Sequence, residues 1–296
     1  MKSENLEENV AKLIRADNIS SEIIISVIIV TYNTPELKDC LSSLDNQTCK
    51  DFEVILVDNG VIGEEIFNSK PYWYPITFIK MRNNLGPSLA RNVGIVHAKG
   101  EICIFLDDDA IPSENYVESI RHAFKDYNII GLRGRILPKD HRNIMNKLAV
   151  YYDLGDNVFP LFISQEGNCA FLKDVLVEVG GFNKDLFGAE GLELSYRIIN
   201  KFGDSNKLVY FPHSIIYHDF SRSIVHFLKK MYRHSNTITK FKKQSPDVYA
   251  FMESYEKLLN HRLTNKKKSE KFFNKVLLIC IKAIGMSAWG IGKIMR

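Results

Sequence analysis

The sequence is most constrained by a short apolar run that ends in three consecutive carboxylates. Ile102–Leu106 follows Gly100-Glu101 and leads directly into Asp107, Asp108 and Asp109. A run of this length between a glycine and a charged segment is typical of a buried strand in a parallel sheet. Ligands of open α/β sheets bind beyond the carboxyl ends of the strands. Because side chains alternate along a strand, we expect the first and third aspartates to point the same way.

Two converging carboxylates suit a hard divalent cation. Such a cation prefers oxygen ligands and keeps water or substrate phosphates in its remaining positions. The alternative is a solvated acidic turn that opens a helix at Pro112. The segments before this run favour the metal site, because they place further polar residues at the ends of other strands.

Strands and helices alternate through the first part of the chain. Buried strands are predicted at 23–30, 52–57, 76–80 and 102–106, and helices at 35–44 and 87–98. This alternation indicates an α/β fold with a doubly wound, mainly parallel sheet flanked by helices. The strand ends carry Thr31, Tyr32, Asn33 and Asp58. They fall on the same edge as the three aspartates, where we expect a nucleotide site.

Neither a dinucleotide-binding fold nor a P-loop is supported, because the chain has no GxGxxG and no GxxxxGK[ST] motif. Further along, strands are predicted at 129–137 and 208–211, and a helix runs from Glu190 to near Gly203. Residues 139–166 are expected to form a loop that faces an acceptor. At the N-terminus, the spacing of the apolar residues predicts an amphipathic helix over 4–16.

Taken in order, these segments resemble family 2 glycosyltransferases, which have the GT-A fold. The matching pieces are Ser26–Asn33, Val54–Gly60, Leu85–Gly94, Phe105–Asp109, Gly180–Phe182, the segment around Glu190 and Tyr217–Asp219. Each piece is short, but together they follow the order of the family over residues 24–240.

The resemblance implies a role for each candidate site residue. Asp107 and Asp109 match the DxD motif that holds Mn²⁺ or Mg²⁺ against the diphosphate of a nucleotide sugar. His218 matches a histidine that completes the metal shell in some members, the alternative being a core or surface histidine. The donor-binding residues would be Thr31, Tyr32 and Asp58 for base and ribose, Arg91 near the diphosphate, and Asn33 and Asp108 beside them.

The sequence departs from the family at the position of the catalytic base. The family commonly has Glu-Asp there, with the aspartate deprotonating the acceptor hydroxyl, whereas this chain has Glu190-Gly191. Glycine cannot accept that proton, because a general base needs a titratable group within hydrogen-bond reach. Glu190 is therefore the first candidate base, Glu193 the second and Asp185 a distant third. The alternative for the glutamates is that acids favour helix N-termini through the dipole.

Several features indicate where in the cell the protein is expected. They are its charge, its cysteine content and the segments near its two ends. The net charge of +4 does not imply nucleic acid as a partner, and the five separated cysteines indicate reduced core thiols in a cytoplasmic protein. The first residues lack the apolar segment of a signal peptide. Near the C-terminus, lysines form a stripe along an apolar helix, which predicts that 265–296 lies on the inner face of the cell membrane. The alternative is packing on the catalytic domain or in a homodimer.

The sequence therefore predicts three segments: an N-terminal helix or tail (1–22), a GT-A catalytic domain (23–220) and a C-terminal helical region (221–296). In that last region, Ser221 is expected to cap a first helix and a second is expected at 247–262. The predicted activity is metal-dependent, inverting transfer from a UDP- or TDP-sugar to a lipid-linked or polysaccharide acceptor. The alternatives are a non-catalytic nucleotide-sugar-binding scaffold and a nucleotidyltransferase of related fold.

Overall fold

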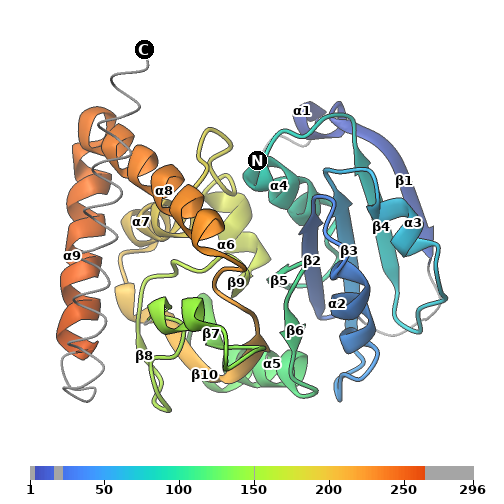
Figure 1. Ribbon diagram of the computed structural model, residues 1–296, viewed down its shortest axis with the longest axis horizontal. Coiled ribbons are helices and arrows are strands. Elements are labelled where there is room, and N and C mark those ends of the chain that lie inside the picture. The colour runs from blue at the N-terminus through green and yellow to red at the C-terminus, as the bar shows by residue number, and fades with distance from the viewer. Residues whose placement is uncertain (1–3, 17–22, 150, 264–296) are drawn as a thin grey trace. The chain divides into compact units, whose positions relative to one another are not determined.

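The computed structural model describes residues 4–16, 23–149 and 151–263 (Figure 1). The chain divides into two compact units, Met1–Leu137 with Asp153–His218 and Pro138–Tyr152 with Asp219–Arg296. The predicted boundary at 220 lies close to the second division, but 138–152 groups with the C-terminal unit. The predicted C-terminal membrane segment, 265–296, lies outside the described residues.

The first unit is built on one sheet of ten strands in the order β1-β4-β3-β2-β5-β9-β7-β10-β6, with β8 paired to β10. The strands are β1 (Val10–Ala16), β2 (Ile25–Thr31), β3 (Phe52–Asp58), β4 (Ile76–Met81), β5 (Ile102–Asp107), β6 (Ile111–Pro112), β7 (Gly131–Leu137), β8 (Phe159–Pro160), β9 (Asn168–Leu172) and β10 (Leu208–Tyr217). Strands β4, β3, β2 and β5 run parallel, as predicted, and β7 and β10 are also parallel to each other. Strand β9 lies antiparallel between β5 and β7, so the sheet is mixed.

The helices of this unit connect the strands. They are α1 (Glu4–Glu7), α2 (Leu37–Leu44), α3 (Gly63–Phe67), α4 (Pro87–His97), α5 (Tyr116–Asp126), α6 (Lys173–Glu178) and α7 (Glu190–Phe202), with a short 3₁₀ turn at Ser205–Lys207. Helix α4 begins at its proline after Gly86, and α7 ends at Gly203, whose φ of 73° is the left-handed conformation of a glycine C-cap. Both boundaries agree with the prediction.

Continuous β-branched and aliphatic runs form the core of the sheet. Every residue of β3 is buried, and six of the seven in β2 are. Strands covered on both faces read as unbroken apolar runs, which is why these elements were predictable. Cys40, Cys49, Cys103 and Cys169 are buried and form no disulfide with one another, as expected of reduced core thiols.

The predicted helix over 4–16 is wrong for most of its length. Only Glu4–Glu7 is helical, and Val10–Ala16 forms strand β1, antiparallel to β4 at the edge of the sheet. The spacing of its few apolar residues fits a helix, but backbone pairing with β4 outweighs that weak local preference.

A short pairing near the site joins distant parts of the chain. Strand β6 follows the three aspartates directly and pairs antiparallel with the end of β10, Ile111 opposite Tyr217 and Pro112 opposite Ile216. The end of β10 is therefore fixed next to the turn that carries the aspartates. This pairing was not predicted from the sequence.

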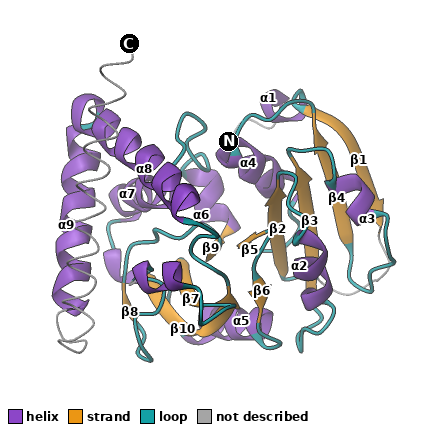
Figure 2. Cartoon of the chain, in the orientation of Figure 1, coloured by secondary structure: helices purple, strands orange, loops and turns teal. Residues whose placement is uncertain are grey.

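The second unit consists mainly of two helices that pack on each other, α8 (Ile224–Gln244) and α9 (Pro246–Leu263), with a 3₁₀ helix at Ile144–Leu148 (Figure 2). Both long helices were predicted. The cap of α8 is Ser223, whose hydroxyl accepts a hydrogen bond from the His226 backbone, and not Ser221 as predicted. No helix within 4–16, 23–149 or 151–263 is long and apolar enough to span a membrane.

Candidate functional site

The carboxyl ends of three parallel strands meet at one edge of the sheet. In the register of β2 with its neighbours, Thr31 lies opposite Asp58 of β3, and Val30 lies opposite Asp107 of β5. The structure therefore brings the polar residues at these strand ends together, as predicted from the alternation of strands and helices.

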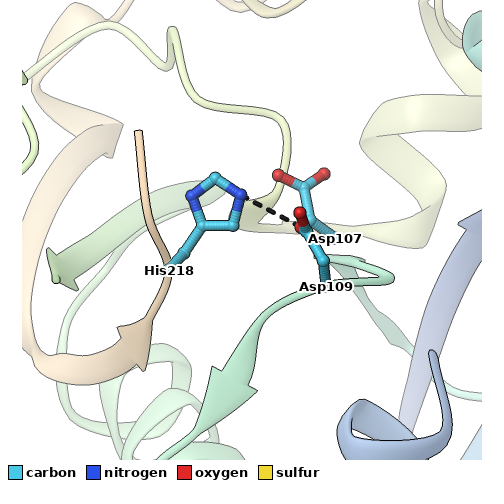
Figure 3. A group of neighbouring side chains, drawn as sticks. All are labelled: Asp107, Asp109 and His218. Carbon is cyan, nitrogen blue, oxygen red and sulfur yellow. Dashed lines mark ion pairs between the residues drawn. The ribbon is translucent and has the colours of Figure 1, made fainter. Parts of the chain in front are cut away.

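Asp107, Asp109 and His218 form one cluster at this edge (Figure 3). Their ligand atoms all lie within 4.8 Å of one another, and His218 Nε2 lies 3.0 Å from Asp109 Oδ1. The aspartates come from the end of β5 and the turn after it. The histidine follows β10, and its backbone N–H donates to the Leu137 carbonyl at 2.8 Å.

The chemistry of this cluster fits a divalent cation. Two carboxylates and one imidazole, each partly exposed, converge on a common point. Carboxylate oxygens suit Mg²⁺ and Mn²⁺, and an imidazole nitrogen is a common further ligand of transition metals.

Gly167 lets the backbone approach Asp107 closely. Its carbonyl accepts a hydrogen bond from the Asp107 N–H at 3.2 Å, and a Cβ added at this glycine would lie 1.8 Å from Asp107 Oδ2. No larger residue fits beside the carboxylate. The loop before β9 is therefore part of the wall of the site.

Asp108 faces the end of β2 and not the metal cluster. Burial raises the pKa of its carboxyl group to about 6, against the opposing effect of the Thr31 and Thr34 hydroxyls, and its two neighbouring aspartates raise it further. Its environment thus differs from that of the aspartates on either side.

The other predicted donor residues occupy varied environments. Asp58 is fully buried; Oδ2 lies 2.8 Å from Lys80 Nζ, and Oδ1 accepts from the Gly60 N–H.

Tyr32 is 57% exposed, so its ring is available to a ligand. Asn33, with a φ of 55°, accepts a hydrogen bond from Val61 N–H and so ties the end of β2 to the loop after β3. The Arg91 guanidinium lies 5.4 Å from the centroid of the Phe182 ring.

The two predicted catalytic glutamates differ in their partners. Both are buried at the start of α7. Glu193 is engaged by Arg197, which donates to both of its carboxylate oxygens at 2.7 Å and also to the Val179 and Gly181 carbonyls. Glu190 is 5% exposed and makes no such pair among the contacts of the described residues. Asp185, the third candidate, lies on the surface.

One acidic residue of this region was missed in the sequence. Glu166 Oε1 accepts a hydrogen bond from the Gly191 N–H at 2.5 Å. Burial and the nearby Glu190 raise the pKa of Glu166 to about 7, while Arg91 opposes them. Its partners lie far away along the chain, and the sequence carries no motif at this position.

Comparison with known proteins agrees with the family resemblance of the sequence. The family model described as "Glycosyl transferase family 2" matches residues 26–182, which is more than half of the chain. An uncharacterized glycosyltransferase of Bacillus subtilis, YwdF, is 30% identical over 173 residues, 55% of this chain and 63% of the relative. The chain thus spans less than two thirds of that relative's length.

Two solved structures show the same fold. S. aureus TarS in complex with UDP-GlcNAc superposes with a TM-score of 0.59 at 16% identity, over 84% of this chain and 78% of the other. The mannosyltransferase PcManGT of Pyrobaculum calidifontis, in complex with GDP-Man and Mn²⁺, gives 0.55 at 16% identity, over 96% and 92%. At this identity the likeness shows the fold alone, which is of the GT-A type.

Proposed function

Because the chain belongs to glycosyl transferase family 2, we propose that it transfers a sugar from a nucleotide diphosphate sugar to an acceptor hydroxyl, with inversion and with a divalent metal. The observation that carries the proposal is the cluster of Asp107, Asp109 and His218 at the carboxyl edge of the sheet. It lies where ligands of open α/β sheets bind.

The cluster would hold Mn²⁺ or Mg²⁺. When bound, the ion would neutralise the negative charge that develops on the leaving diphosphate, without any proton transfer. His218 Nε2 and Asp109 Oδ1 lie 3.0 Å apart, so both atoms could coordinate one ion.

The donor would lie along the ends of β2 and β3. Tyr32 offers an exposed ring to the base, and Thr31 and Asn33 lie beside it. The Asp58 carboxylate is held by Lys80 and by a backbone N–H, so we assign it to shaping the base and ribose pocket. Arg91 would lie near the diphosphate, and Asp108 would line the same edge.

The acceptor side is proposed at the start of α7, where Glu190 lies. Both Glu193 oxygens are bonded to Arg197, so this glutamate is better suited to hold the helix than to take a proton. A lipid-linked or polysaccharide acceptor, and membrane contact through 265–296, stay predictions from the sequence.

The direct test is calorimetric titration of UDP into the purified protein with and without Mn²⁺. Binding that requires Mn²⁺ and is lost in Asp109→Asn would support the proposal. Asp126→Asn, an exposed acid at the far end of α5, is the matched control and should bind as the wild type does. If UDP, TDP and GDP all failed to bind, the proposed donor site would be refuted.

The same protein distinguishes the two alternatives. A nucleotidyltransferase would release pyrophosphate from a nucleoside triphosphate and a sugar phosphate. A non-catalytic scaffold would bind UDP-sugars with Mn²⁺ but release no UDP from them with any acceptor.

A further inference from the structure

Glu166 directly precedes the loop residue that contacts the cluster of Asp107, Asp109 and His218. The following residue, Gly167, accepts a hydrogen bond from the Asp107 N–H and leaves no room for a side chain beside the Asp107 carboxylate. Glu166 is therefore the chain neighbour of Gly167, the residue that contacts Asp107.

The side chain of Glu166 reaches the start of α7. Oε1 accepts from the Gly191 N–H at 2.5 Å, and a Cβ added at Gly191 would lie 2.8 Å from that oxygen and 2.8 Å from the Ile163 carbonyl. The glycine thus leaves the space that the Glu166 carboxylate fills. A carboxylate is present at this point of the site, although the α7 sequence itself does not supply it.

The three glutamates near Gly191 differ in their partners and in their exposure. Glu193 is 6% exposed and bonded through both oxygens to Arg197, and Glu190 is 5% exposed. Glu166 is intermediate in exposure. A general base must come within hydrogen-bond reach of the hydroxyl that it activates, and Glu193 is the least free to do so, because Arg197 holds both of its oxygens.

We propose that Glu166 is the general base of the transfer reaction and that Glu190 is the neighbouring charge that tunes it. This inference rests on the proposed function. The acceptor O–H gives its proton to the Glu166 carboxylate, and the acceptor oxygen forms a bond to the anomeric carbon of the sugar. The bond from that carbon to the diphosphate oxygen breaks, and its electron pair leaves with the nucleoside diphosphate. No further reactant is needed.

The electrostatics of the site agree with this role. Burial and Glu190 raise the pKa of Glu166 to about 7, whereas Arg91 of α4 and the Gly191 N–H oppose them. The other titratable group beside it is the Cys169 thiol of β9, whose pKa burial raises far above its ordinary value, so that it stays neutral. A base is most effective when its pKa lies near the working pH.

The first arm of the test measures turnover as UDP release from UDP-GlcNAc and UDP-glucose with Mn²⁺, with water as the acceptor. Glu166→Gln should lower the rate about 10²- to 10⁴-fold, the range of general-base catalysis. It should keep the wild-type affinity for UDP with Mn²⁺ and stay folded, because the glutamine amide oxygen can still accept from the Gly191 N–H. Glu166→Asp should recover part of the rate. Glu101→Gln, an exposed acid at the opposite end of β5, is the control.

The second arm follows proton binding directly. Carbon-13 NMR of protein labelled at the glutamate carboxyl carbons, assigned by comparison with Glu166→Gln, should show Glu166 titrating near pH 7. Glu190→Gln removes a negative charge, so it should lower the midpoint of Glu166 and move the acid limb of the rate profile to lower pH. A Glu166 that titrates as an ordinary glutamate would overturn the inference.

The outcomes separate this inference from the proposed function. Protein that binds no nucleotide with Mn²⁺ refutes the proposed function. Wild-type turnover that survives in Glu166→Gln refutes only the role of Glu166. Turnover abolished by Glu190→Gln but merely shifted in pH by Glu166→Gln would exchange the two roles, and would also overturn the inference.

Discussion

Gly191→Ala is expected to destabilise the protein, although the same change usually stabilises a helix. Alanine is favoured over glycine inside a helix by about 0.5–1 kcal/mol. Here the added methyl would lie 2.8 Å from both Glu166 Oε1 and the Ile163 carbonyl oxygen. Overpacking of this kind costs about 1–3 kcal/mol. A displaced Glu166 would also lose its hydrogen bond to the residue 191 N–H, which as a charge-assisted bond is worth about 1.5–3 kcal/mol.

These contributions leave a net loss of about 1.5–5.5 kcal/mol in the free energy of unfolding, with the helix preference subtracted. In a protein of this size, 1 kcal/mol lowers the melting temperature by about 2–4 °C. Urea unfolding followed by circular dichroism, with thermal melts beside it, measures both quantities. Asn200→Ala, an exposed site on the same helix, is the control and should stabilise slightly.

A double-mutant cycle identifies the cause. In a Glu166→Ala background, Gly191→Ala should cost less, because one of the two close atoms is gone while the Ile163 carbonyl remains. Gly191→Ala as stable as the wild type would refute the reasoning. An equal cost in both backgrounds would show that the carboxylate does not occupy this space.

Three further outcomes are expected. Gly167→Ala should displace the Asp107 carboxylate, since a Cβ there would lie 1.8 Å from it, and so weaken the binding of UDP with Mn²⁺ in calorimetry while the affinity for UDP alone changes little. Arg197→Met should leave Glu193 buried without its partner and lower the stability by about 3–5 kcal/mol in urea unfolding; a loss below 1 kcal/mol would contradict this assignment. Ser223→Ala should remove the cap of α8 at a cost of about 1 kcal/mol, measured by thermal melting with no change in nucleotide affinity.

The sheet was predictable where burial on both faces produces an unbroken apolar run. Strands β2, β3, β4 and β5 were found at nearly their observed bounds, and the polar residues at their ends marked the site. Strand β1 was not, because the spacing of the few apolar residues in this segment fits a helix. Pairing with β4, which lies some sixty residues further along the chain, decides its conformation.

The cluster of Asp107, Asp109 and His218 was predictable, but the surroundings of Gly191 were only partly so. Asp107 and Asp109 follow a recognisable strand, and His218 follows another. Glu166 belongs to no pattern, because its position depends on the approach of the β9 loop to α7, a contact between segments separated by 25 residues. In the sequence, Gly191 stands where the family commonly has an aspartate. In the fold, this glycine leaves the space that the Glu166 carboxylate occupies.

The pairing of β6 with β10 links the binding of a cation to the completion of the fold. His218 and the aspartates lie roughly 110 residues apart in the chain, so a chain that has not formed β10 must close a large loop to bring them together. During synthesis, the chain can chelate a cation with all three side chains only after the last of the described strands has joined the sheet. A cation that binds at this position should therefore stabilise the chain with the completed sheet by RT ln(1 + [L]/Kd). It should not stabilise a chain in which β10 is still unpaired.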